Sequence, residues 1–326
     1  MVLFVPLDMN PIIHYFRISY LFALALLFSS PTFLSAQTKN GFDLSNASIP
    51  VDEILSGGPP RDGIPSIDNP RFVSAEDAYY LQRKDQVLGI EIDEQARAYP
   101  LRILVWHEIV NDRLAGEPIV VTYCPLCGTA MVFRADPGVD ARDFGVSGLL
   151  YNSDVLLYDR TNNSLWSQLK MEAVSGADVG TKLELLPSQL VTWEAWKKQH
   201  PDTQVLSTNT GHGRDYERQP YQGYEKSNRL MFPAANNDSV PFDNKTWVAG
   251  AVDGDQVVAF PIPKLPDNEA VTVKAGGNTY KATYDPQSEH VSIEKNGAQQ
   301  PLATVKAYAF AWHAFYPNTV YWQISE

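Results

Sequence analysis

The sequence predicts an α+β protein that is rich in strands, in which two related β-units pack together with a few short helices. The first observation is composition, because 7 Trp, 16 Tyr and 14 Phe with 23 Pro and 20 Gly are typical of many strands joined by turns. The second is the alternation of apolar and polar residues over short runs, and the third is a repeat within the chain. With 326 residues, 44% of them hydrophobic, the chain is long enough for one large or two moderate domains.

Residues 1–36 have the pattern of a signal peptide. An apolar core, Ile18–Phe28, follows a basic residue, and Leu34–Ala36 offers small residues for cleavage. The apolar run is shorter than the roughly 20 residues that a membrane-spanning helix needs, so we expect no stable span after cleavage. We therefore expect an exported protein, periplasmic or extracellular, whose translation starts at Met1 or at Met9.

The remaining chain is expected to form three segments. Residues 37–70 are polar and rich in Pro and Gly, which predicts an extended arm. Residues 71–235 form the first β-rich unit, and residues 236–326 form the second, degenerate one. The elements expected in the first unit are a short helix at 75–81 after Ser74, strands at 87–92, 96–101 and 118–122, and central strands at 144–160 and 164–168.

The clearest helix is expected at residues 192–200. Trp193 and Trp196 have helical spacing, which favours a role in the core, and Pro201 ends the helix. Hairpins are expected at 271–300 in the second unit.

Two stretches of the chain resemble each other when Gly89 is laid over Gly250. Residues 89–100 then match 250–261, and Thr122–Pro125 matches Thr283–Pro286. We interpret this as two copies of one β-rich unit, although hairpins restrict sequence strongly enough to give some likeness on their own. In this register His107 falls on Asn268, Cys124 on Asp285 and Cys127 on Ser288, so candidate ligands occur in the first copy alone.

The strongest chemical signal is the turn Cys124-Pro125-Leu126-Cys127-Gly128, which has the form of a metal knuckle. Two thiolates supply half of a tetrahedral zinc or iron site. The chain has only 2 Cys, so the other ligands must be His, Asp, Glu or water. His107, in the cluster Trp106–Asp112, is the first candidate.

A Cys/Cys/His set with an open fourth position is typical of a catalytic metal centre. We expect copper, zinc or iron, because soft ligands in an exported protein suit these ions. Glu108 or Asp154 would then serve as a general acid or base, or would orient a ligand. The spacing does not fit the zinc deaminase motif, in which a residue separates His from Glu and Pro precedes the first Cys. The sequence leaves open whether such a centre is enzymatic.

Two alternatives use the cysteines without a metal. In an exported protein the pair can act as a thiol–disulfide oxidoreductase, in which Cys124 attacks and Cys127 resolves. The other is a non-enzymatic binding module in which the cysteines are structural.

Polar residues in otherwise apolar strands are the candidates for binding a substrate, because buried polar groups need partners. They are Asn111, Ser147, Asn152, Asp159 and Arg160. A formal net charge of -12 argues against binding nucleic acid through its phosphates, and the sequence indicates no nucleotide cofactor. The expected partner is a small molecule or a metal ion.

Three motifs carry a resemblance to a known family. They are Tyr123–Thr129 (YCPLCGT), Trp106–Asp112 (WHEIVND) and Ser147–Arg160 (SGLLYNSDVLLYDR), with Ser164–Gln168 beside them. They resemble the family catalogued as domain of unknown function 3179, found in exported or membrane-associated microbial proteins. The resemblance implies membership and says almost nothing about activity. His107, Glu108, the two cysteines and the candidate polar residues all lie in these motifs, whereas His212 and His313 lie outside them.

Overall fold

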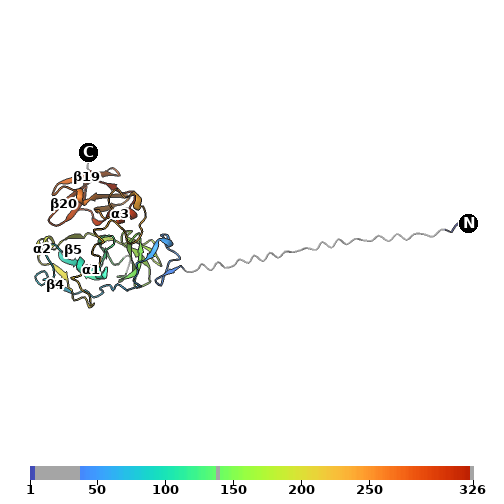
Figure 1. The fold of residues 1–326 in the computed structure, drawn as a ribbon, viewed down its shortest axis with the longest axis horizontal. Coiled ribbons are helices and arrows are strands. Elements are labelled where there is room, and N and C mark those ends of the chain that lie inside the picture. The colour runs from blue at the N-terminus through green and yellow to red at the C-terminus, as the bar shows by residue number, and fades with distance from the viewer. Residues whose placement is uncertain (4–36, 137–139, 324–326) are drawn as a thin grey trace. The chain divides into compact units, whose positions relative to one another are not determined.

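The computed structural model describes residues 1–3, 37–136 and 140–323, so most of the expected signal peptide lies outside the described residues. Residues Ala36–Glu326 form a unit of their own, and everything below concerns the described residues of that unit. It is rich in strands with three short α-helices among the described residues, as the sequence predicts (Figure 1). None of the described helices has the length and apolar character needed to cross a bilayer.

The α-helices are α1 (Leu101–His107), α2 (Trp193–Gln199) and α3 (Ala309–Phe315), and the 3-10 helices are η1 (Val51–Glu53), η2 (Asn237–Ser239) and η3 (Ile262–Lys264). The strands are β1 (Thr38–Lys39), β2 (Phe42–Asp43), β3 (Ile54–Ser56), β4 (Phe72–Ser74), β5 (Gln86–Ile92), β6 (Gln95–Pro100), β7 (Ile109–Leu114), β8 (Glu117–Cys124), β9 (Thr129–Arg134), β10 (Phe144–Tyr151), β11 (Asp154–Asp159), β12 (Leu165–Ser167), β13 (Glu172–Ser175), β14 (Leu185–Leu186), β15 (Gln189–Thr192), β16 (Gln204–Leu206), β17 (Trp247–Asp253), β18 (Gln256–Pro261), β19 (Ala270–Ala275), β20 (Asn278–Asp285), β21 (His290–Lys295), β22 (Val305–Tyr308) and β23 (Val320–Tyr321).

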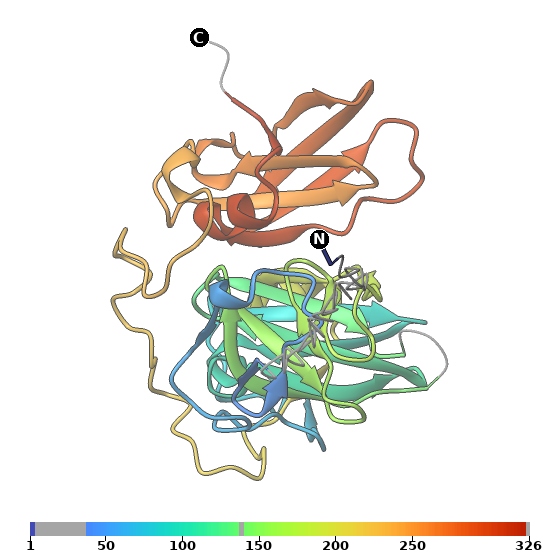
Figure 2. The ribbon, with the colours of Figure 1, turned by 90° about the vertical axis from the view of Figure 1, so that its right-hand side faces the viewer.

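Four sheets precede residue 207. Their strand orders are β1-β2, β13-β12-β11-β10-β3, β14-β9-β8-β7 and β15-β5-β6-β16-β4. Two further sheets follow residue 246, with orders β22-β17-β18-β23 and β19-β20-β21. Figure 2 shows these later strands, in orange and red, as a layer of their own. The segment between them, 207–246, contains η2 and no strand.

The predicted helix at 192–200 is confirmed as α2. Thr192 is its N-cap and accepts a hydrogen bond from the Ala195 N–H at 3.4 Å. Trp193 and Trp196 are buried, and a Cβ at Gly89 on β5 would clash with the Trp196 ring.

The predicted helix at 75–81 is wrong, because these residues form turns after β4. Ser74 does accept the Asp77 N–H at 3.2 Å, but it also bonds the Asp77 side chain at 2.9 Å, and the cap closes a local turn. Helices α1 and α3 had no expected counterpart. Helix α3 is almost uniformly apolar and buried, and α1 has only seven residues, most of them apolar, so neither shows the amphipathic period by which a helix is recognised.

Candidate metal centre

The two cysteines lie on the turn between β8 and β9. Cys124 ends β8 and pairs with Thr129, the first residue of β9. Gly128 closes the turn at φ +67°, and a Cβ there would lie 2.5 Å from the Trp247 ring, so only glycine fits. Both cysteines are buried and free of a disulfide.

Asp154 joins the cysteines from the neighbouring hairpin. Asn152 and Ser153, at φ 52° and 64°, form a left-handed turn between β10 and β11. This turn directs the Ser153 carbonyl to the thiols, which donate to it over 3.3 Å from Cys127 and 3.6 Å from Cys124. One ligand atom from each of Cys124, Cys127 and Asp154 lies within 4.8 Å of the others, so the three side chains can hold a metal ion.

The Asp154 carboxylate is incompletely satisfied. Its Oδ2 accepts the Leu169 N–H at 2.9 Å, whereas its Oδ1 is buried and has no hydrogen-bond partner among the described residues. A buried carboxylate oxygen without a donor is costly unless it binds a proton or a cation. Burial accordingly raises the pKa of Asp154 to about 7.

Glu108 is a second buried carboxyl group beside this cluster. It is the left-handed C-cap of α1, at φ 60°, and its N–H bonds the Leu104 carbonyl at 2.7 Å. Burial, and then the negative charge of Asp154, raise the pKa of Glu108 to about 8. Burial also raises the pKa of both thiols, and no basic side chain is among the groups that influence them most. Four acidic groups therefore share one buried site.

His107 faces elsewhere and is not part of the Cys124–Cys127–Asp154 group. Its Nδ1 lies 2.7 Å from the Pro65 carbonyl, and its Nε2 lies 2.7 Å from the Tyr216 hydroxyl. Since a carbonyl only accepts, Nδ1 donates to Pro65 and Nε2 accepts from Tyr216. Burial lowers the pKa of His107 to about 4, so the ring is neutral and both nitrogens are engaged.

The five polar strand residues are engaged in contacts within the protein. Asn111 bonds the Phe144 backbone at both ends, at 2.8 Å each, and Ser147 donates to the Leu156 carbonyl. The Asn152 side chain accepts the Ala235 N–H, and Asp159 forms an ion pair with Arg142. Arg160 forms an ion pair with Asp62 and donates a hydrogen bond to the Ser66 hydroxyl. These contacts join β7 to β10, β10 to β11, and the ends of β10 and β11 to neighbouring loops.

The coil at 207–246 covers the cysteine turn, which sequence reasoning did not foresee. The Tyr224 hydroxyl donates to the Leu126 carbonyl at 3.1 Å, and the Ser153 hydroxyl donates to the Phe232 carbonyl at 2.7 Å. The Lys245 amine bonds the carbonyls of Tyr224 and Ser227 at 3.1 and 3.0 Å. The only available signal was the density of Tyr, Asn and Ser in a segment without periodicity.

Comparison with known proteins gives one match. Residues 61–300 match the model of a family described as protein of unknown function, DUF3179. No curated protein and no solved structure matches the chain.

Proposed function

The chain belongs to the DUF3179 family, and we propose that this member binds one transition-metal ion through Cys124, Cys127 and Asp154. The description of the family names no activity, so the proposal depends on the geometry of the site. The observation that carries it is the buried Asp154 Oδ1, which has no described donor and lies beside two buried thiols.

The electrostatics of the site also support a cation. Without one, burial keeps protons on Asp154, Glu108 and both thiols, which is what their raised pKa values express. A divalent ion would replace these protons, because metal ligands bind in the deprotonated form.

The donor set favours zinc, with copper and iron as the other candidates. Two thiolates and one carboxylate are compatible with tetrahedral zinc, and they leave a fourth position for water, a substrate or Glu108. His107 would support the site from outside, because its ring fixes α1 to Pro65 and Tyr216 and so positions the adjacent Glu108.

Metal analysis of the purified protein tests this proposal. Protein reconstituted with zinc or copper under reducing conditions, and then desalted, should hold about one ion per chain. Asp154→Asn should lower the stoichiometry or weaken binding by at least about tenfold, because a neutral amide is a poor ligand for these ions. Asp285→Asn, at the corresponding turn of β20 and β21, is the matched control and should bind as wild type does. Wild-type protein that keeps both thiols titratable and retains no ion would refute the proposal.

A thiol oxidoreductase is the second candidate function, favoured by the closeness of two unbridged sulfurs. Burial raises the pKa of both thiols, which lowers the thiolate fraction needed for attack, so we rank it below metal binding. A disulfide that forms reversibly in metal-free protein, with a defined potential against glutathione, would favour it.

We also propose that the β-rich regions are two copies of one unit. In support, the β7–β9 and β19–β21 strands have equal lengths and equal spacing. Gly89 lies against Trp196 and Gly250 against Trp312, and a Cβ at either glycine would clash with that ring. The Trp196 indole donates to Thr203 at 2.9 Å, and the Trp312 indole donates to Thr319 at 3.0 Å.

Export is proposed as well, with residues 1–36 removed as a signal peptide and the mature chain periplasmic or extracellular. N-terminal sequencing of the protein expressed with its own leader should give Gln37 as the first residue. A mature chain that retains the apolar segment would contradict this.

A further inference from the structure

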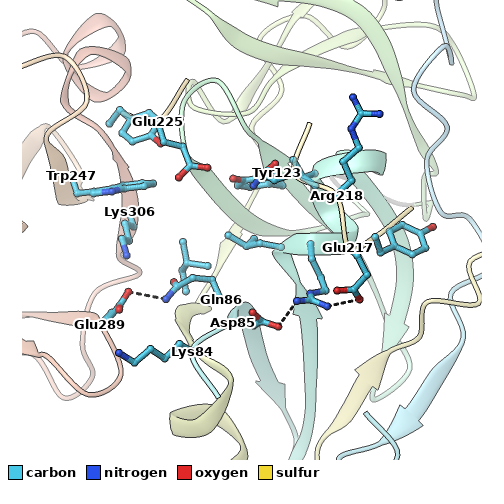
Figure 3. Close-up of a pocket in the computed structure, with 17 residues that line it drawn as sticks. Lys84, Asp85, Gln86, Tyr123, Glu217, Arg218, Glu225, Trp247, Glu289 and Lys306 are labelled. Atoms are coloured by element: carbon cyan, nitrogen blue, oxygen red, sulfur yellow. Dashed lines mark hydrogen bonds and ion pairs between the residues drawn. The ribbon is translucent and has the colours of Figure 1, made fainter. Parts of the chain in front are cut away.

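A cavity of about 380 Å³ lies where β5, α1 and β8 approach β17, β22 and the turn between β20 and β21 (Figure 3). It is separate from the cysteine cluster, since Cys124 does not line it and the preceding Tyr123 does. Side chains alternate along a strand, so Tyr123 and Cys124 point to opposite faces of β8. The cavity has the size of a small-molecule site.

One wall of the cavity is aromatic. The Trp247 and Tyr308 rings lie 4.2 Å apart between centroids, at 38°, and Tyr123 lines the cavity near them. The Lys306 amine lies 5.0 Å from the centre of the Trp247 ring. Figure 3 shows Trp247, Lys306 and Tyr123 around one space, with Glu289 and Gln86 at its lower side.

Most of the acidic groups in the wall are already engaged. Arg102 pairs with Asp85 and with Glu217 at 2.9 Å each, and Glu289 accepts a hydrogen bond from Gln86 at 2.9 Å. Glu225 is exposed and forms no ion pair with a described residue, and it also lines the cavity, close to Tyr123 and Tyr308.

Lys306 differs from these groups. Its amine forms no ion pair or hydrogen bond with any described residue, and burial lowers its pKa even though Glu289 is near enough to raise it. The only described contact of this half-buried ammonium group is with the Trp247 ring, so it retains its capacity to donate hydrogen bonds, and an anion in the cavity would supply the acceptor.

We propose that this cavity binds a small organic carboxylate that carries a flat apolar ring. The carboxylate contacts the Lys306 amine, and the ring packs on Trp247, Tyr308 and Tyr123. This assignment is independent of the metal centre.

Calorimetric titration with three probes of similar shape tests the proposal. Phenylacetate, phenylacetamide and phenethylamine share a ring and differ in the charge of the polar group. The full mature chain at neutral pH should bind phenylacetate saturably and at least about tenfold more tightly than the amide, because a charge-assisted bond to Lys306 is stronger than a neutral one. Phenethylamine should bind most weakly.

Variants connect that preference to named residues. Lys306→Met should abolish the difference between phenylacetate and phenylacetamide, and Lys306→Arg should retain it. Trp247→Leu should weaken both probes. Lys264→Met removes a lysine that lies over Phe242, away from the cavity, and should leave binding unchanged.

A thermal melt that matches wild type shows that a variant is folded. If Lys306→Met does not fold, Lys306→Arg still tests the proposal, because loss of the preference for phenylacetate in that variant would contradict it. Equal affinity for acid and amide, tighter binding of the amine, or no saturable binding of any probe would overturn the proposal.

Discussion

Two turns of this molecule have the same backbone role and different chemistry. The β8–β9 turn begins at Cys124, paired with Thr129, and the β20–β21 turn begins at Asp285, paired with His290. In each turn a backbone carbonyl accepts a hydrogen bond from the residue that precedes a helix, Tyr308 before α3 and Thr192 before α2. Cys127 accepts the Tyr308 N–H at 2.9 Å, and Ser288 accepts the Thr192 N–H at 3.0 Å.

The difference lies in how each turn satisfies its acidic groups. The Asp285 carboxylate accepts the Ser288 hydroxyl at 2.6 Å and the Gln287 N–H at 2.9 Å. Partial burial raises the pKa of Asp285, but these hydrogen bonds outweigh it and leave the pKa below its ordinary value. Beside the cysteine turn, Asp154 has one well-formed hydrogen bond, from the Leu169 N–H, and otherwise only weaker contacts such as those with the thiols of Cys124 and Cys127, so burial dominates. A carboxylate with its own donors needs no ion, and one without them is suited to bind a cation.

The largest expected effect is on the pH dependence of stability. The raised folded-state pKa values of Asp154 and Glu108, about 7 and about 8, exceed the ordinary values of 3.8 and 4.5 for these groups. With respect to these groups, the metal-free protein should be most stable below about pH 4. It should lose stability as pH rises from there, and the loss should be complete above about pH 7 for Asp154 and about pH 8 for Glu108. At about 1.4 kcal/mol per pKa unit the loss is on the order of 4 to 5 kcal/mol for either group taken alone, and the sum is smaller because the two groups interact. Urea unfolding at a series of pH values measures it.

Asp154→Asn and Glu108→Gln should flatten that profile, and zinc should reverse it, because metal binding releases the protons. Asp285→Asn should not change the slope in this range. His107 acts in the opposite sense, since its lowered pKa makes stability fall as pH drops below 6.5. Its contribution is common to wild type and to both carboxyl variants, so the difference in stability between wild type and variant at each pH isolates the carboxyl groups. If the free energy of unfolding of the wild-type, metal-free chain did not change with pH, Asp154 and Glu108 would not be destabilised by burial, and the electrostatic difference between the two turns would be refuted.

The next effect concerns the last residue of each turn. Gly128 and Glu289 both have positive φ, 67° and 57°, but only Gly128 lies against Trp247. Gly128→Ala should cost about 2–3 kcal/mol through backbone strain and overpacking. Glu289→Ala should cost less than about 1 kcal/mol. Chemical denaturation of both variants gives the two values, and equal costs would show that Trp247 does not constrain the cysteine turn.

The smallest effect is expected at Asp285 itself. Asp285→Asn keeps one acceptor oxygen and should destabilise the protein by about 0.5–1 kcal/mol, as is usual for one weakened hydrogen bond. Asp154→Asn should instead stabilise the metal-free protein above pH 7, because it removes a buried charge. Thermal melts above pH 7 should therefore show a lower Tm for Asp285→Asn and a higher Tm for Asp154→Asn than for wild type. A change of the same sign in both variants would contradict the difference between the two carboxylates.

Local chemistry made part of this structure predictable. Thr192 and Pro201 delimit α2, and alternating residues mark β5, β6 and the later hairpins. The Cys-x-x-Cys spacing placed two sulfurs on one turn, and the polar Asp154 within apolar neighbours marked it as a candidate. By contrast, α3 is buried on nearly all sides and α1 is a short, mostly apolar helix, so neither leaves a clear period in the sequence.

The sequence by itself determined the turn that holds Cys124 and Cys127, the strands on either side of it and the membership of the chain in its family. Tertiary structure decided which third side chain meets the sulfurs. His107 and Glu108 are adjacent, but α1 ends between them, and the left-handed backbone at Glu108 turns the two side chains to different environments. Asp154 comes from another sheet, and no pattern of spacing connects it to the cysteines. The packing of β11 against the β8–β9 turn, which depends on residues throughout the core, brings them together.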